Sequence, residues 1–366
     1  MRYFDHAATS PMRESARTAW LSAADMLNPG GQYAAGRAAN RALAEARETV
    51  AAALDCEPIE VIFTGSGTEA DNLAIQGLFR KSPLQRVVST EIEHPAVLET
   101  VAALDAEVEM LPLTDGRVSS FEALATPAAL ATCMWANNET GIIQPVAELV
   151  AAAGHTPVHV DAVQAVGHVP VSFANLGATT LAGSAHKFGG PRGVGILLAR
   201  RNGPAPTIFG GGQQRGIRPG TVDVAGAVAT AAALSEAVSE IPAETARLTE
   251  LRERLQAGIA LIDGAVVHSR GQVLPGHVHV SFPGAEGDSL IMLLDMLGIA
   301  ASTGSACASG VNRASHVLLA MGVAEDVARG ALRFTLGRTT TAADVDFLLA
   351  HLGGVVDKAR KAGMAF

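Results

Sequence analysis

The residue of this chain best suited to covalent chemistry is Lys187. The sequence has four lysines in 366 residues, and Lys187 is the one set in a glycine-rich, otherwise apolar stretch, residues 184–193. Arginine supplies nearly all the other positive charge, and a guanidinium cannot give up its proton to form an imine. A lysine in such surroundings therefore indicates an amine nucleophile. The alternative is a loop lysine whose amine simply extends into water.

A second candidate is the glycine-rich turn at residues 65–68, which joins a predicted strand to a predicted helix. Backbone N–H groups at a helix N-terminus, together with the hydroxyls of Ser66 and Thr68, form a site for an anion such as phosphate. The turn matches neither the Walker pattern nor the dinucleotide-binding glycine pattern. The alternative is an ordinary helix cap at Thr68, with Asp71 as the third helical residue.

Further polar residues follow predicted strands. They are His94, Asn138 and Asp161, with Gln164 three positions after Asp161. Open α/β sheets bind ligands at the C-terminal ends of their strands, so we expect these side chains to share one site. An imine-forming lysine, a carboxylate for a pyridinium nitrogen and a phosphate cradle together fit pyridoxal 5′-phosphate (PLP). The alternatives are a loop role for His94, a helix-capping role for Asp161 and a solvated helical position for Gln164.

The three cysteines, Cys56, Cys133 and Cys307, are far apart in the sequence. An odd, sparse set is a poor disulfide framework, and without a C-x-x-C pair it indicates no metal site. Cys307 lies among small residues at 302–310, which predicts a mobile, exposed nucleophile; a buried structural cysteine is the alternative. Cys133 is predicted in a core strand, and Cys56 in an acidic turn that disfavours the thiolate.

The elements that must position these residues follow from short apolar runs alternating with helical patterns. Such alternation predicts a mostly parallel sheet covered by helices. The predicted strands are residues 61–64, 86–89, 107–111, 130–136, 158–161, 179–182 and 193–199, with a half-buried strand at 277–282 and a short one at 331–335. The predicted helices are residues 69–79, 95–103, 224–240, 243–262, 288–297 and 342–362.

The length predicts about two domains. We expect a large α/β domain with a seven-stranded sheet at residues 13–243, and a smaller α+β domain at residues 244–366 on which residues 1–12 pack. With 48% hydrophobic residues, there is ample apolar surface for both cores.

The net charge of −9 argues against nucleic acid or an anionic membrane surface as the main partner. The absence of a run of about 18 uncharged apolar residues argues against a membrane span. The first residues lack the apolar core of a signal peptide. We therefore expect a cytoplasmic protein.

Taken together, these motifs resemble those of the cysteine desulfurases, within the class V aminotransferase family of fold-type I PLP enzymes. The resemblance spans nearly the whole chain in family order. The matching segments are residues 3–9, 64–72, 93–97, 137–141, 161–164, 184–195, 210–221, 302–309 and 333–338.

The resemblance implies a role for each site residue. Lys187 would form the Schiff base with PLP, Asp161 would keep the pyridine nitrogen protonated, and Gln164 would bond the phenolic oxygen. His94 would stack on the ring and assist proton transfers. The residues implied in binding the phosphate are Gly67, Thr68, Ser184 and His186, with Thr221 reaching it from a partner subunit. A homodimer is therefore expected.

The implied substrate is L-cysteine. Asn138 would position it and Arg333 would bind its carboxylate bidentately. Cys307 would attack its sulfur and keep it as a persulfide while alanine leaves. The resemblance implies delivery to a sulfur-acceptor protein, either an iron–sulfur scaffold or a thiolation carrier.

The sequence departs from the family pattern at Gly30, Gly31, Tyr33 and Gln214. The alternatives that remain open are a selenocysteine lyase or an aminotransferase of the same fold, a catalytically silent PLP-binding subunit, and an α/β protein that binds no PLP. The intact set of Lys187, Asp161, Arg333 and Cys307 argues against a silent subunit.

Overall fold

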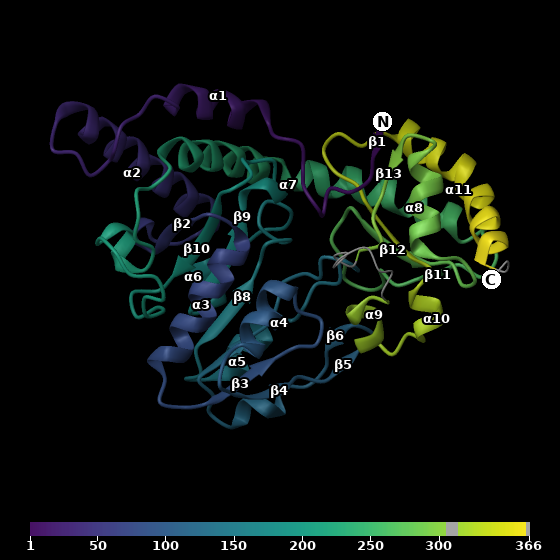
Figure 1. Ribbon diagram of the computed structural model, residues 1–366, viewed down its shortest axis with the longest axis horizontal. Helices are drawn as coiled ribbons and strands as arrows, with labels where there is room; N and C mark the ends of the chain where they lie inside the picture. The colour runs from purple at the N-terminus through teal and green to yellow at the C-terminus, as the bar shows by residue number, and fades with distance from the viewer. Residues whose placement is uncertain (305–313, 364–366) are drawn as a thin grey trace.

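A computed structural model describes residues 1–304 and 314–363, which form two neighbouring groups of layered elements (Figure 1). The first is built on a seven-stranded sheet with the order β2-β10-β9-β8-β7-β3-β4, in which β10 runs antiparallel to both neighbours and the other pairs are parallel. The predicted mostly parallel sheet is thereby confirmed. Its strands are β2 (Val61–Thr64), β3 (Arg86–Ser89), β4 (Glu107–Met110), β7 (Leu130–Thr132), β8 (Val158–Asp161), β9 (Thr180–Ser184) and β10 (Gly195–Ala199).

Both faces of this sheet are covered because its central strands are apolar on both sides. Along β2, Ile62 packs in one cluster with α3 (Gly67–Lys81), whereas Val61 and Phe63 pack on the opposite face. α4 (Pro95–Ala102) lies on the α3 face. The other face carries α1 (Glu14–Ala23), α2 (Ala34–Leu54), α5 (Val146–Ala153), α6 (Phe173–Leu176) and the first part of α7 (Val224–Ile259).

The second group surrounds a three-stranded antiparallel sheet, β11-β12-β14. Its strands are β11 (Val266–Val267), β12 (His277–Ser281) and β14 (Ala331–Thr335), and β1 (Arg2–Tyr3) pairs with β13 (Ile299–Ala300) beside them. Its helices are α8 (Gly287–Asp295), α9 (His316–Ala320), α10 (Glu325–Ala328) and α11 (Ala342–Gly363). A two-stranded hairpin, β5 (Leu113–Thr114) and β6 (Arg117–Val118), completes the strands of the described residues.

The two helices predicted at 224–240 and 243–262 are one continuous helix, α7, with Pro242 inside it. A proline in a helix removes one hydrogen bond and usually breaks or kinks it. Here both halves are anchored, because residues up to Ala237 pack in the first core and residues from Leu248 onward pack in the second. The domain limit at residue 243 stays a prediction, and it falls inside this helix.

One further prediction differs from the structure. β12 was expected to be half-buried, but all five of its residues are buried because its polar residues face neighbouring structure rather than solvent.

α7 alone among the described helices is long and apolar enough to cross a membrane by length and composition, although it contains no run of about 18 uncharged residues. This is weak evidence, because 61% of its most apolar window is buried in the protein, as in a core helix.

Candidate active site

A cleft of about 1180 Å³ lies where elements of the two groups meet. Its walls come from the C-terminal ends of β2, β8 and β9, from the N-terminal segment and from β14. Ten residues predicted from the sequence line it: Gly67, Thr68, His94, Asn138, Asp161, Gln164, Ser184, His186, Lys187 and Arg333. Thr221 is exposed and is not among the described residues that line the cleft. Cys307 lies outside the described residues.

Lys187 ends the short 3₁₀ turn Ala185–Lys187, which follows β9 directly. Its Nζ donates hydrogen bonds to the carbonyl oxygens of Ala7 at 2.6 Å and Ala8 at 3.1 Å. Burial, followed by the positive charge of Arg333, lowers the pKa of the Lys187 amine from 10.5 to about 8. A sizeable fraction of this amine is therefore unprotonated near neutral pH, which is the nucleophilic form.

Asp161 ends β8, and its Oδ1 accepts a hydrogen bond from the N–H of Val163 at 2.9 Å. The carboxyl therefore also caps the following turn, as in the simpler alternative. Burial raises the pKa of Asp161, and His94 acts in the opposite direction. Two more buried carboxyls, Asp71 and Glu93, are electrostatically coupled to it. A cationic group placed against Asp161 would offset the effect of burial and favour the ionised carboxylate of Asp161.

His94 is the N-cap of α4 rather than a simple loop residue. The N–H of Ala96 donates to its Nδ1 at 3.1 Å, so the proton of the neutral ring resides on Nε2. Burial is the largest influence on the pKa of His94 and lowers it. His94 lines the cleft, and in this tautomer its Nε2 is a hydrogen-bond donor.

The glycine-rich turn is capped by Ser66, not by Thr68 as the simpler alternative had it. Ser66 Oγ accepts a hydrogen bond from the N–H of Glu69 at 3.0 Å. The N–H groups of Gly67 and Thr68 stand in the first turn of α3, where a helix offers donors without intrahelical partners. A Cβ on Gly67 would lie 2.8 Å from Val163 Cγ2 and 3.3 Å from Ser184 Cβ. Only glycine leaves this cradle open for an anion.

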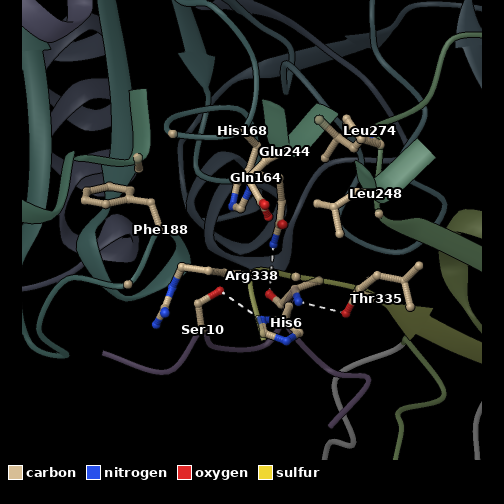
Figure 2. Close-up of a pocket in the computed structure, with 18 of the residues that line it drawn as sticks. His6, Ser10, Gln164, His168, Phe188, Glu244, Leu248, Leu274, Thr335 and Arg338 are labelled. Atoms are coloured by element: carbon tan, nitrogen blue, oxygen red, sulfur yellow. Dashed lines mark hydrogen bonds between the residues drawn. The ribbon is translucent and has the colours of Figure 1, made fainter. Parts of the chain in front are cut away.

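The N-terminal segment crosses from the small sheet to the cleft. Ala7 N–H donates to Thr335 Oγ1 at 2.9 Å, and Gln164 Nε2 donates to Ala7 O at 3.0 Å. His6, Ser10, Gln164 and Thr335 line a second cavity (Figure 2). Its volume is about 60 Å³. Gln164 is thus buried, and the alternative of a solvated helical residue is wrong.

Arg333 lies on β14 with its side chain 5% exposed. Nη1 donates to the carbonyl oxygen of Asn138 at 2.8 Å, and Nη2 donates to Asp5 Oδ1 at 2.6 Å. Its buried Nε has no hydrogen-bond partner among the described residues. The residue predicted to bind a substrate carboxylate is therefore already paired with a carboxylate of the protein.

Sequence reasoning missed Asp5, Glu139 and His316, which also line the cleft. Glu139 Oε2 accepts a hydrogen bond from Ser315 Oγ, and His316 Nε2 donates to the carbonyl oxygen of Glu93 at 3.0 Å. Asp5 and Glu139 lie within the matching segments 3–9 and 137–141, but the resemblance was not used to assign a role to either residue. His316 had no comparable signal.

The two described cysteines agree with the prediction in burial and thiolate character, but Cys133 does not lie within a strand. Cys133 follows β7 and is fully buried. Burial, followed by the charge of Glu60, raises the pKa of the Cys56 thiol to about 12. The thiolate of Cys56 is therefore disfavoured, although burial contributes more than the acidic neighbours.

Comparisons with known proteins establish the family of the chain. The sequence model of the class V aminotransferases matches residues 2–348, and the chain belongs to that family. It is 46% identical to an IscS-like cysteine desulfurase of Mycobacterium tuberculosis, over 100% of this chain and 98% of the relative. Among solved structures, a NifS-like protein superposes with a TM-score of 0.91 at 35% identity, over 98% of this chain and 100% of that chain. SspA in complex with cysteine superposes with a TM-score of 0.80 at 28% identity, over 93% and 100%.

Family membership confirms the predicted fold-type I architecture and the PLP cofactor. The structure of the cleft supports the same cofactor independently of family membership. The cradle at Gly67 would be filled by a single Cβ, the buried Asp161 calls for a cation beside it, and the amine of Lys187 is held inside the cleft. An α/β protein without PLP, which the sequence alone left open, is excluded.

Proposed function

We propose that the protein is a PLP-dependent cysteine desulfurase. It converts L-cysteine and an enzyme thiol into L-alanine and an enzyme persulfide, so that the sulfur moves from the substrate Cβ to the thiol sulfur. The observation that carries the proposal is a single cleft in which an amine, a buried carboxyl and a buried guanidinium surround an anion cradle. The desulfurase relative that matches the full chain at 46% identity supports the same reaction.

In this proposal PLP supplies an electron sink that weakens the Cβ–Sγ bond of the bound amino acid. Lys187 Nζ would hold the cofactor covalently, and Asp161 would pair with its ring nitrogen. Gln164 lines the same cleft, donates to Ala7 O, and would bond the phenolic oxygen. Gly67 and Thr68 in the first turn of α3 would hold the phosphate together with Ser184 and His186.

The proposal gives Lys187 and His94 different roles in the proton transfers. Lys187 Nζ, with its pKa lowered to about 8 by burial and then by Arg333, is the better acceptor for the substrate Cα proton. The lowered pKa of His94 favours its neutral ring, in which Nδ1 accepts from the N–H of Ala96 and Nε2 can donate a hydrogen bond. We therefore assign proton removal to Lys187 and hydrogen-bond donation to His94.

Substrate binding is assigned to Arg333 for the carboxylate and to Asn138 for placement beside the cofactor. Asn138 contributes its carbonyl oxygen to Arg333, so it also fixes the guanidinium. Cys307 is the proposed sulfur acceptor on the enzyme. The complex of SspA with cysteine supports cysteine as the ligand of this class of cleft.

We further propose a homodimer in which Thr221 of one subunit approaches the phosphate of the other. The exposure of Thr221 leaves it available for such a contact. The persulfide sulfur would pass to an iron–sulfur scaffold or a thiolation carrier in the cytoplasm.

The test is to incubate the purified enzyme with PLP and L-cysteine and to measure alanine, with sulfide measured in the presence and absence of a reductant. Cys307→Ser should abolish alanine formation while the absorbance of the bound cofactor is retained. Unchanged turnover in that variant would contradict the role of Cys307. Borohydride reduction and peptide mapping should place a pyridoxyl group on Lys187.

A selenocysteine lyase or an aminotransferase would give a different product pattern. Alanine released from selenocysteine but not from cysteine would identify a lyase. A keto acid formed in place of alanine would identify an aminotransferase.

A further inference from the structure

The ion pair between Asp5 and Arg333 has a consequence for substrate binding. We propose that Asp5 is a resident carboxylate that competes with the substrate carboxylate for Arg333 and thereby sets how tightly amino acids bind. This inference rests on the proposed role of Arg333 in binding the substrate.

The backbone register brings the two side chains together. Asp5 forms a parallel bridge with Thr335, which lies two residues after Arg333 on β14. Residues two apart on a strand point to the same face. Two backbone hydrogen bonds fix this register, Thr335 N–H to Phe4 O at 2.7 Å and His6 N–H to Thr335 O at 3.4 Å. Asp5 is therefore placed beside the guanidinium by the main chain.

The burial of the Arg333 guanidinium explains why it is paired with Asp5. The Arg333 side chain is 5% exposed and that of Asp5 is 20% exposed, with 2.6 Å between Nη2 and Oδ1. A buried guanidinium without an anion is strongly destabilised. Asp5 provides that anion when no substrate is bound.

The same geometry makes Asp5 a competitor. Arg333 Nη1 is bonded to Asn138 O and Nη2 to Asp5, while Nε is buried without a partner among the described residues. A substrate carboxylate can bind the guanidinium bidentately in two ways, either through Nε and one terminal nitrogen or through both terminal nitrogens. In either case it must share or displace a hydrogen bond that a terminal nitrogen already makes with the protein. The substrate carboxylate would also lie close to the negative charge of Asp5.

Asp5 also faces Lys187. The pKa of the Lys187 amine is lowered by burial and Arg333, and it is raised by Asp161 and Asp5. Asp5 therefore interacts electrostatically with both Arg333, by a direct ion pair, and Lys187, by longer-range attraction. Displacement of Asp5 from Arg333 by substrate would thus leave it the attraction of Lys187.

Asp5→Asn tests the competition because the amide keeps an oxygen that accepts from Nη2 but carries no charge. Asp5→Asn replaces a bond between two opposite charges by a bond with one charged partner, which weakens it by about a factor of 10 in equilibrium constant. We expect the holoenzyme variant to bind L-alanine about 10-fold more tightly, measured by titration of the cofactor absorbance and by calorimetry. KM for L-cysteine should fall with it, while kcat does not rise.

Arg333→Gln and the double variant separate this inference from the proposed function. Arg333→Gln should weaken L-alanine binding, and in that background Asp5→Asn should improve binding less than it does in the wild type, because only the repulsion between the two carboxylates is then relieved. Asp5→Ser, which also removes the charge, should reproduce the tighter binding if Asp5→Asn fails to fold. Equal or weaker L-alanine binding in the charge-removing variant, with Arg333→Gln impaired, would overturn the role of Asp5 alone. Unimpaired binding in Arg333→Gln would overturn the role of Arg333 and this inference with it.

Discussion

Replacing Gly67 by alanine should weaken PLP binding without unfolding the protein. The added Cβ would stand 2.8 Å from Val163 Cγ2 and 3.3 Å from Ser184 Cβ. Val163 is β-branched and stiff, so it cannot swing aside freely. Either Val163 or Ser184 must move, and both line the cleft.

The size of the effect follows from two opposing contributions. Overpacking costs about 1–3 kcal/mol, whereas alanine in place of glycine in a helix favours folding by up to about 1 kcal/mol. The unfolding free energy should therefore fall by about 3 kcal/mol or less. If the cost appears mainly in the cofactor-bound state, about 1–3 kcal/mol corresponds to a loss of PLP affinity of about 5-fold to 150-fold.

The assay is equilibrium dialysis of PLP against the variant, together with urea unfolding of the cofactor-free protein. Gly354→Ala is a matched control, because that glycine also lies in a helix, α11, and a Cβ there would meet nothing within 4 Å. The control should bind PLP normally and be equally or more stable. PLP affinity of Gly67→Ala equal to that of the control would refute the assignment of this turn as the phosphate cradle.

Two further predictions concern the amine of Lys187 and the packing of the N-terminal segment at His6. In cofactor-free protein, acylation of Lys187 should rise with pH and level off above its lowered pKa of about 8, because only the unprotonated amine reacts. Asp161→Asn should shift the midpoint to lower pH because Asp161 raises that pKa, and a midpoint at or above the wild-type value would contradict this. Gly337→Ala should destabilise the protein by about 1–3 kcal/mol, since its Cβ would lie 2.2 Å from His6 Nδ1. Urea unfolding beside Gly354→Ala measures the loss, and equal stability would show that the His6 segment yields without cost.

The strands that carry the site were predictable because each is a short apolar run. β2, β3, β8 and β14 begin and end where the sequence places them. The polar residues at their ends followed from the general placement of ligands in α/β sheets. Lys187, Asp161 and Gln164 were found in this way, and they do line one cleft.

What the sequence could not provide depends on contacts between distant residues. Asp5 and Arg333 are separated by 328 positions, and only the register of the N-terminal segment against β14 joins them. Two separate helices were predicted at residues 224–240 and 243–262, yet burial on both sides of Pro242 keeps α7 continuous. The capping role of Ser66 in place of Thr68 was a difference of two positions, within the usual uncertainty of helix ends.

The unbroken α7 has a practical consequence for dissecting this enzyme. Its early residues, such as Leu234, belong to one core and its later residues, such as Leu255, to the other. A chain divided at residue 243 would give two fragments that each end in half of a helix with one terminus newly exposed. The two halves of the molecule are therefore best studied through point substitutions on either side of Pro242 and not through separate expression.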